Sequence, residues 1–111
     1  MRMKDYLVLV TFDLNYAKSK NYSAVNAFLE SKGFETLSHR GHDLPSNTYL
    51  GTENISLLGS ETTNEGAERL KKKIYSSIKG KMNGEGLQSV VFVMVSPKDG
   101  TVYSCSNPKD Y

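Results

Sequence analysis

The sequence predicts a single α+β domain, residues 1–111, in which two helices cover one face of an antiparallel sheet. Two nearly continuous apolar runs, "YLVLVTFDL" at 6–14 and "SVVFVMV" at 89–95, predict strands, and the first is expected to be covered on both faces. Two stretches between these runs place apolar residues at helical spacing. A chain of 111 residues can bury one hydrophobic core, and we expect no second one.

Local signals after the first run predict a helix and a second strand. Asn21 or Ser23 can cap the helix, and Gly33 stands where a left-handed residue would end it. Residues 34–39, "FETLSH", alternate apolar and polar side chains, which is the pattern of a half-exposed strand. "HRGHDLPSN" at 39–47 then predicts a loop, because it is rich in glycine, aspartate, proline and asparagine.

The next segments predict a third strand and a second helix. "TYLGTENISLL" at 48–58 is a strand pattern, although Gly51 and Asn54 predict that it is bulged, short or divided. Thr62 and Glu65 form a capping-box pattern that starts a helix, which ends around Gly80 and the following "NGEG". The apolar face of this helix comprises Ala67, Leu70, Ile74 and Ile78, and its basic residues Arg69, Lys72, Lys73 and Lys79 fall largely elsewhere.

The end of the chain completes a known topological plan. "PKDG" predicts a turn, and "TVYSCS" at 101–106 predicts a short extra strand. The order strand, helix, strand, strand, helix, strand is the ferredoxin-like βαββαβ sandwich. In that plan the last strand lies at the sheet edge beside the first, yet "VVFVMV" is too apolar for an edge in water. We therefore expect a second subunit, or at least the short final strand, to cover it, which predicts a twofold homodimer.

The charge balance and the cysteine content limit the other classes of function. Lysine and arginine number 14 against 12 aspartates and glutamates, and a net charge of +2 does not by itself indicate a nucleic-acid partner. The apolar run after Lys4 ends at Thr11, so we expect neither a signal peptide nor a membrane span, and a cytoplasmic location. Cys105 is the single cysteine and cannot form an internal disulfide.

Asp13 is a candidate functional residue because it ends a buried strand, where a rigid scaffold can present side chains. The simpler alternative is that Asp13 only caps the loop that follows. A single carboxylate binds Mg²⁺ weakly, since this ion usually takes one or two carboxylates together with substrate phosphates. A twofold axis near Asp13 would bring two copies of it together, and Mg²⁺ is then the candidate cofactor.

The motifs "YLVLVTFDL", "SKGF" and "LPSNTYLG" and the element order across most of the chain resemble a family of small ferredoxin-like endoribonucleases. These are related to the CRISPR-associated adaptation nucleases, to VapD and to the GhoS-type antitoxins. The GhoS-type proteins resemble it more closely, through the pair Phe12–Asp13 and the proline-bearing loop. The resemblance implies that Asp13 is a metal ligand. It also implies RNA cleavage, which GhoS-type proteins use to neutralise a membrane toxin through its messenger RNA.

The segment "SHRGHD" at 38–43 concentrates side chains that ribonuclease chemistry uses. Cleavage needs a base for the ribose 2′-OH, an acid for the leaving oxygen and a cation for the phosphate. His39, His42 and Arg40 are the candidates for these roles. The alternative is a solvated polar loop, and two histidines without a cysteine partner do not complete a zinc site.

Residues 69–81, "RLKKKIYSSIKGK", could follow a phosphate backbone through Lys72 and Lys73, with Tyr75 stacking on a base. Tyr16 and Tyr22 flank the loop after Asp13 and could stack on single-stranded RNA. The alternatives are a solvated helix face for the lysines and packing for the tyrosines.

Two hypotheses about function follow. The first is a small endoribonuclease of toxin–antitoxin or mobile-element type that cleaves single-stranded RNA, with or without a metal. The second is a non-catalytic dimeric module that binds RNA or protein, for example a phage-encoded inhibitor. The candidate residues are Asp13, His39 and His42 for catalysis, Asp13 for the metal, and Arg40, Lys72, Lys73 and Tyr16 for RNA binding.

Overall fold

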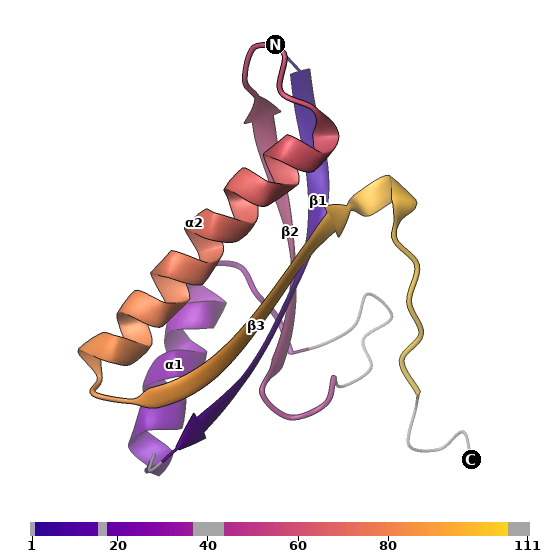
Figure 1. Cartoon of the computed structure of the whole chain (residues 1–111). Helices are drawn as coiled ribbons and strands as arrows, with labels where there is room; N and C mark the ends of the chain where they lie inside the picture. Colours follow the sequence, from indigo (N-terminus) through magenta and orange to yellow (C-terminus); the bar gives the residue numbers. More distant parts are fainter. Residues whose placement is uncertain (1, 16–17, 37–43, 107–111) are drawn as a thin grey trace.

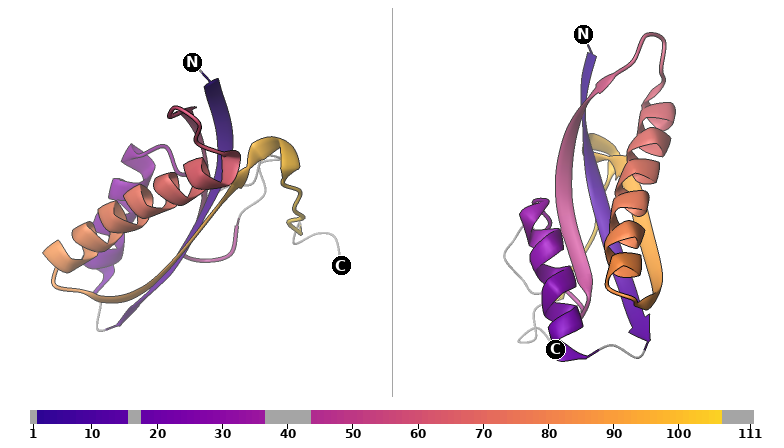
Figure 2. Two further views of the ribbon diagram at one scale, coloured as in Figure 1. Left: turned by 45° about the horizontal axis from the view of Figure 1, so that its top comes forward. Right: turned by 90° about the vertical axis from the view of Figure 1, so that its left-hand side faces the viewer.

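The computed structural model describes residues 2–15, 18–36 and 44–106. Its elements are β1 (Arg2–Asn15), α1 (Ser19–Ser31), β2 (Thr48–Leu57), α2 (Thr63–Gly84), β3 (Gln88–Pro97) and the 3₁₀ helix η1 (Lys98–Gly100) (Figure 1). Within these residues, three strands form one antiparallel sheet in the order β2-β1-β3. Both helices lie on one face of the sheet (Figure 2), as the α+β prediction requires.

Strand β1 lies at the centre of the sheet because it pairs with both neighbours. Val8 is aligned with Gly51 of β2 and with Val95 of β3. The side chains of β1 that face the helices are almost fully buried, and they are Tyr6, Val8, Val10, Phe12 and Leu14. The opposite side of the strand carries Leu9 and the exposed Asp13. The predicted strand is confirmed, but the prediction that it is covered on both faces is wrong at the end that carries Asp13, because both helices lie on the opposite face.

Helix α1 begins before the predicted cap and ends at the predicted glycine. The backbone N–H of Lys18 donates to Oδ1 of Asn21 over 2.9 Å, so Asn21 lies in the first turn and does not occupy the cap position. Gly33 has a φ of 88°, the left-handed conformation that the sequence predicts for it. Val25 and Leu29 anchor the helix in the core.

Helix α2 begins with the predicted capping box. The backbone N–H of Glu65 donates to the Thr62 hydroxyl over 3.1 Å, and the backbone N–H of Thr62 donates to the Glu65 carboxylate over 2.9 Å. The helix continues past Gly80 and ends at Gly84, within the predicted "NGEG". Tyr6 of β1 stabilises the first turn of the helix, because its hydroxyl donates a hydrogen bond to the carbonyl of Thr63 over 2.6 Å. Burial raises the pKa of the Tyr6 phenol, so this hydroxyl stays protonated.

The strand predicted at 34–39 is reduced to one bridge within the described residues. Glu35 pairs with Leu50 through two backbone hydrogen bonds of 2.9 and 2.8 Å, along the edge of β2 away from β1. Phe34, the residue before the bridge, is buried in the core. Residues 37–39 lie outside the described part. Strand β2 is continuous, so the predicted bulge or division is wrong.

The extra C-terminal strand is also wrong, because residues 101–106 make no strand pairing. Pro97 ends β3 and has no N–H for a further ladder bond. The Thr101 hydroxyl then lies 2.7 Å from the carbonyl of Pro97, which holds the turn after η1. The described part of the chain is therefore a three-stranded sheet with two helices, and it does not contain all six elements of the predicted plan. Neither of its helices is long and apolar enough to span a membrane.

Candidate functional site

Asp13 lies on the face of the sheet that the helices leave uncovered. It is aligned with Val90 of β3, two residues before β1 ends at Asn15. Its neighbours along the strand, Phe12 and Leu14, point into the core and fix the direction of the Asp13 side chain. Asp13 itself is exposed. The sequence therefore placed it correctly, at the accessible end of a buried strand, and its catalytic and metal-binding roles stay predictions.

Beside Asp13, strand β3 presents an apolar surface that we call the β3 strip: Val90, Phe92 and Met94. These side chains are 68%, 53% and 46% exposed, although they occupy the middle of a strand. They are aligned with Asp13, Thr11 and Leu9 of β1. Within the described residues the outer edge of β3 has no strand partner. An exposed apolar patch beside an open edge is typical of an interaction surface.

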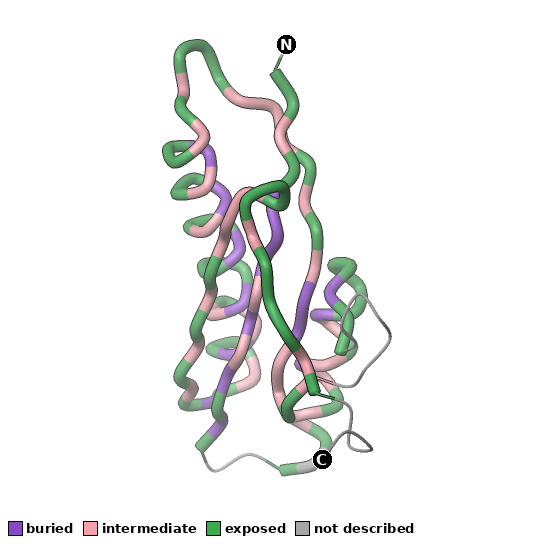
Figure 3. The backbone as a smooth tube through the Cα atoms, turned by 90° about the vertical axis from the view of Figure 1, so that its right-hand side faces the viewer, coloured by how far each residue is buried: buried purple, intermediate pink, exposed green. Residues whose placement is uncertain are grey.

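The C-terminal segment 101–106 crosses the other end of this helix-free face (Figure 3). Together with the sheet it lines an open cavity of about 630 Å³, whose walls include Leu7, Leu9 and Met94. Leu7 is only 7% exposed, although it faces away from the helices. The segment thus covers one end of the face. Val90 and Phe92 remain largely exposed.

The metal prediction depends on Asp13 alone within the described residues. No group of three histidine, cysteine, aspartate or glutamate side chains comes together in residues 2–15, 18–36 and 44–106 to hold an ion. One carboxylate supplies a single ligand, so a second copy of the chain or a substrate phosphate would have to supply the others.

The two predicted RNA-binding lysines lie on different sides of α2. Consecutive residues of a helix point about 100° apart. Lys72 faces a shallow groove of about 430 Å³ between α2 and β3, together with Tyr75 and Phe92. Lys73 faces the other helix instead. The structure therefore does not join the two lysines in one patch.

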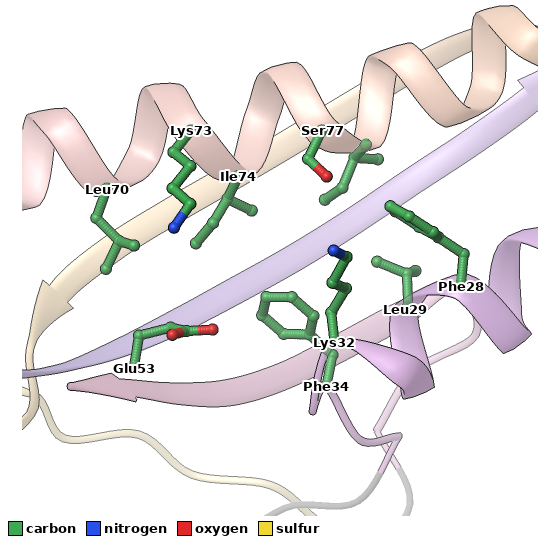
Figure 4. A pocket seen from close by; sticks show the side chains of 10 residues that line it. Phe28, Leu29, Lys32, Phe34, Glu53, Leu70, Lys73, Ile74 and Ser77 are labelled. Carbon is green, nitrogen blue, oxygen red and sulfur yellow. The ribbon is translucent and has the colours of Figure 1, made fainter. Parts of the chain in front are cut away.

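Lys73 belongs to a small cleft between α1 and α2, which we call the helix cleft (Figure 4). Its volume is about 150 Å³. In Figure 4 the ammonium of Lys73 points down from α2, and that of Lys32 points up from the end of α1. The carboxylate of Glu53 extends from β2 beside the ring of Phe34. The cleft is lined by Phe28, Leu29, Lys32, Phe34, Glu53, Leu70, Lys73, Ile74, Ser77 and Ile78.

The sequence builds this cleft through a close contact between Phe34 and β2. A Cβ atom at Gly51 would lie 2.7 Å from Cδ1 of Phe34, so only glycine lets the ring settle against the strand. Glu53 follows two residues later on the same, helix-facing side of β2. None of the ion pairs between described residues uses Lys32, Glu53 or Lys73. The cleft therefore combines aromatic side chains with three charges that form no ion pair with another described residue.

The remaining candidates lie outside the described residues. They are Tyr16, His39, Arg40 and His42. Their assignments as a stacking residue, two catalytic histidines and a phosphate-binding arginine stay predictions.

Sequence reasoning missed Lys32, Phe34 and Glu53 as possible site residues. Glu53 carried a usable signal, because it occupies an inward position of a strand whose other inward residues include Tyr49 and Ile55. A carboxylate in such a register is unfavourable unless it meets a polar partner. Lys32 carried no such signal, since a lysine after a helix end is common on protein surfaces.

A scan against protein-family models and searches of curated proteins and of solved structures found no match to this chain.

Proposed function

We propose that the chain is a small homodimeric endoribonuclease that cleaves single-stranded RNA, with Asp13 at its reactive centre. The observation that carries this proposal is the position of Asp13: exposed, at the end of the central strand, and directly beside the apolar β3 strip. A rigid strand fixes the carboxylate, and the helix-free face leaves room for a polynucleotide or a second subunit.

The strand arrangement supports the ferredoxin-like assignment on which the resemblance depends. In that plan the first strand is central, the last strand lies beside it at one edge, and the third lies on its other side. Strands β1, β3 and β2 have this arrangement. The bridge between Glu35 and Leu50 lies where the second strand of the plan would pair. We infer that the described residues of this segment, 34–36, contribute this edge.

The exposed β3 strip supports the homodimer. Three apolar side chains on a strand with an open edge favour association, because burying them removes apolar surface from water. A second copy of the chain is the occupant we propose for this surface. Since Asp13 is aligned with Val90, a twofold axis close to this end of the strip would bring the two Asp13 carboxylates together.

Two facing carboxylates and a substrate phosphate fit the preference of Mg²⁺ for oxygen ligands. In the proposed site Asp13 holds the ion or positions the scissile phosphate, and Mg²⁺ would stabilise the charge that develops on it. His39 and His42 are proposed as base and acid, and Arg40 as a phosphate ligand. Tyr16, Lys72 and Lys73 are proposed to bind the RNA. The protein is proposed to be a cytoplasmic protein of toxin–antitoxin or mobile-element type.

The test is incubation of end-labelled single-stranded RNA with the purified chain in Mg²⁺ and in excess chelator. The proposal expects cleavage in Mg²⁺ that stops with chelator and that the Asp13→Ala variant lacks. If cleavage persists in chelator but is still lost in Asp13→Ala, Asp13 is not a metal ligand and instead positions the phosphate electrostatically. An Asp13→Ala variant that is as active as the wild type would show that Asp13 has no role in cleavage.

The β3 strip also favours a second candidate function, a non-catalytic module that binds RNA or another protein. An exposed apolar strip on an open edge serves binding whether or not Asp13 reacts. RNA that is retained by the protein without being cut would favour this alternative over the nuclease.

A further inference from the structure

The helix cleft has the size of a site for one small flat group. Its volume of about 150 Å³ is roughly that of a cavity known to hold a benzene-sized ring. Phe28 and Phe34 supply aromatic surface, and Leu29, Leu70 and Ile74 close the apolar walls. A single six-membered ring fits this space.

The charges around the cleft restrict the chemistry of the group that it can bind. Lys32 and Lys73 approach the cleft from opposite helices, so they suit an anion at its mouth (Figure 4). Glu53, on β2 beside Phe34, is less exposed than either lysine, and a carboxylate there accepts hydrogen bonds but repels another anion. The ligand therefore needs a flat ring, an N–H donor on the edge of that ring, and an anionic group outside it.

A pyrimidine nucleotide with an exocyclic amino group combines these three features. We infer that the helix cleft binds a cytosine nucleotide: the base enters against Phe34, its N4 amino group donates to Glu53, and its phosphate lies between Lys32 and Lys73. Carboxylates accept hydrogen bonds from the N4 amino group of cytosine, and unstacked RNA bases are commonly held on aromatic side chains. Uracil presents a carbonyl at the same position, which Glu53 would repel.

The inference rests on the proposed RNA function, because it gives that RNA a preferred base. Lys73 then contacts the strand through this cleft, while Lys72, which faces the opposite groove, does not take part. The cleft lies on the helix side of the sheet and Asp13 on the other side. The base recognised here is therefore separate from the phosphate that is cut.

The test is titration of the full chain with cytidine 5′-monophosphate and with uridine 5′-monophosphate, followed by NMR chemical shifts or calorimetry. We expect the cytidine nucleotide to bind at least about tenfold more tightly. The Glu53→Gln variant should bring this ratio close to one, because its amide can also donate to uracil. Glu30→Gln, at an exposed position of α1, is the matched control and should keep the preference.

Lysine variants test the phosphate contact. Lys73→Met should weaken binding of both nucleotides several-fold, and Lys20→Met, at an exposed position of α1 outside the cleft, should weaken neither. Equal binding of the two nucleotides, tighter binding of a purine nucleotide, or no binding would each overturn the inference. Its failure is separable from that of the nuclease proposal, because nucleotide binding is measured without cleavage.

Discussion

Two glycines of α2 should respond to the same substitution in opposite directions. Gly66 and Gly80 both lie inside the helix. Replacing glycine by alanine in a helix interior normally stabilises a protein by about 1 kcal/mol, because the unfolded chain loses conformational freedom. Nothing lies within 4 Å of a Cβ atom at Gly80, so Gly80→Ala should give about 0.5–1 kcal/mol of stability.

At Gly66 the added methyl group meets the core. A Cβ atom there would collide with Cδ2 of Leu57 and lie 2.7 Å from the hydroxyl oxygen of Tyr6, which is fully buried and bonded to Thr63. Overpacking costs about 1–3 kcal/mol, and displacing the Tyr6 hydrogen bond costs about 1 kcal/mol more. After subtracting the helix gain, Gly66→Ala should lose about 1–3 kcal/mol of stability. This variant tests how tightly α2 rests on β1.

Urea denaturation of the wild type and both variants, followed by circular dichroism, measures these differences. The urea concentration at the unfolding midpoint should be highest for Gly80→Ala, intermediate for the wild type and lowest for Gly66→Ala. The denaturant slopes should stay equal, because the surface exposed on unfolding does not change. A Gly66→Ala protein as stable as Gly80→Ala would show that the helix does not lie on Tyr6 as described, and would refute the reasoning.

Three further predictions test the turn at 58–61, the β3 strip and the helix cleft. Hydrogen bonds from Arg69 and from the backbone hold the pKa of Glu61 below its ordinary value of 4.5, so its ionised form favours the folded state. The stability advantage of wild type over Glu61→Gln should be full above about pH 4.5 and disappear as the pH falls through the lower folded-state pKa; a constant difference in acid denaturation profiles would contradict this. Phe92→Asp should convert a dimer into monomers by sedimentation, while Leu58→Asp, also on an exposed residue, should not; dimers in both would place the interface elsewhere. Gly51→Ala should displace the ring of Phe34, cost about 1–3 kcal/mol in denaturation and weaken cytidine nucleotide binding; unchanged binding would show that the ring is not the floor of the site.

The elements defined by local chemistry could be predicted from the sequence. The capping box of Thr62 and Glu65 and the left-handed Gly33 depend on a few neighbouring residues, and both are present. The strand at 34–39 was harder to predict, because its alternation did not reveal that Phe34 would enter the core. The segment 101–106 contains strand-forming residues, yet Pro97 and η1 turn it across the sheet, which is a tertiary effect.

The site was predictable only where one strand determines it. The alternation along β1 fixes the outward direction of Asp13, so its exposure followed from the buried residues around it. The separation of Lys72 from Lys73 depends on where α1 packs, and the run "KKK" says nothing about that. The helix cleft joins residues from α2, β2 and the end of α1 that are distant in sequence, and no local pattern brings them together.

The proposed part of the Asp13 carboxylate in RNA cleavage is tested by the single-turnover cleavage rate of Asp13→Asn. Asp5→Asn is the matched control, because Asp5 is an exposed aspartate on the same face of β1. Asp5 accepts a hydrogen bond from the side-chain amide of Asn54, and the amide oxygen of an asparagine can accept it too. Loss of a charge that stabilises a reacting phosphate costs on the order of 100-fold or more. We expect such a loss of cleavage rate for Asp13→Asn and an unchanged rate for Asp5→Asn. Equal rates in the two variants, with equal amounts of dimer, would contradict it.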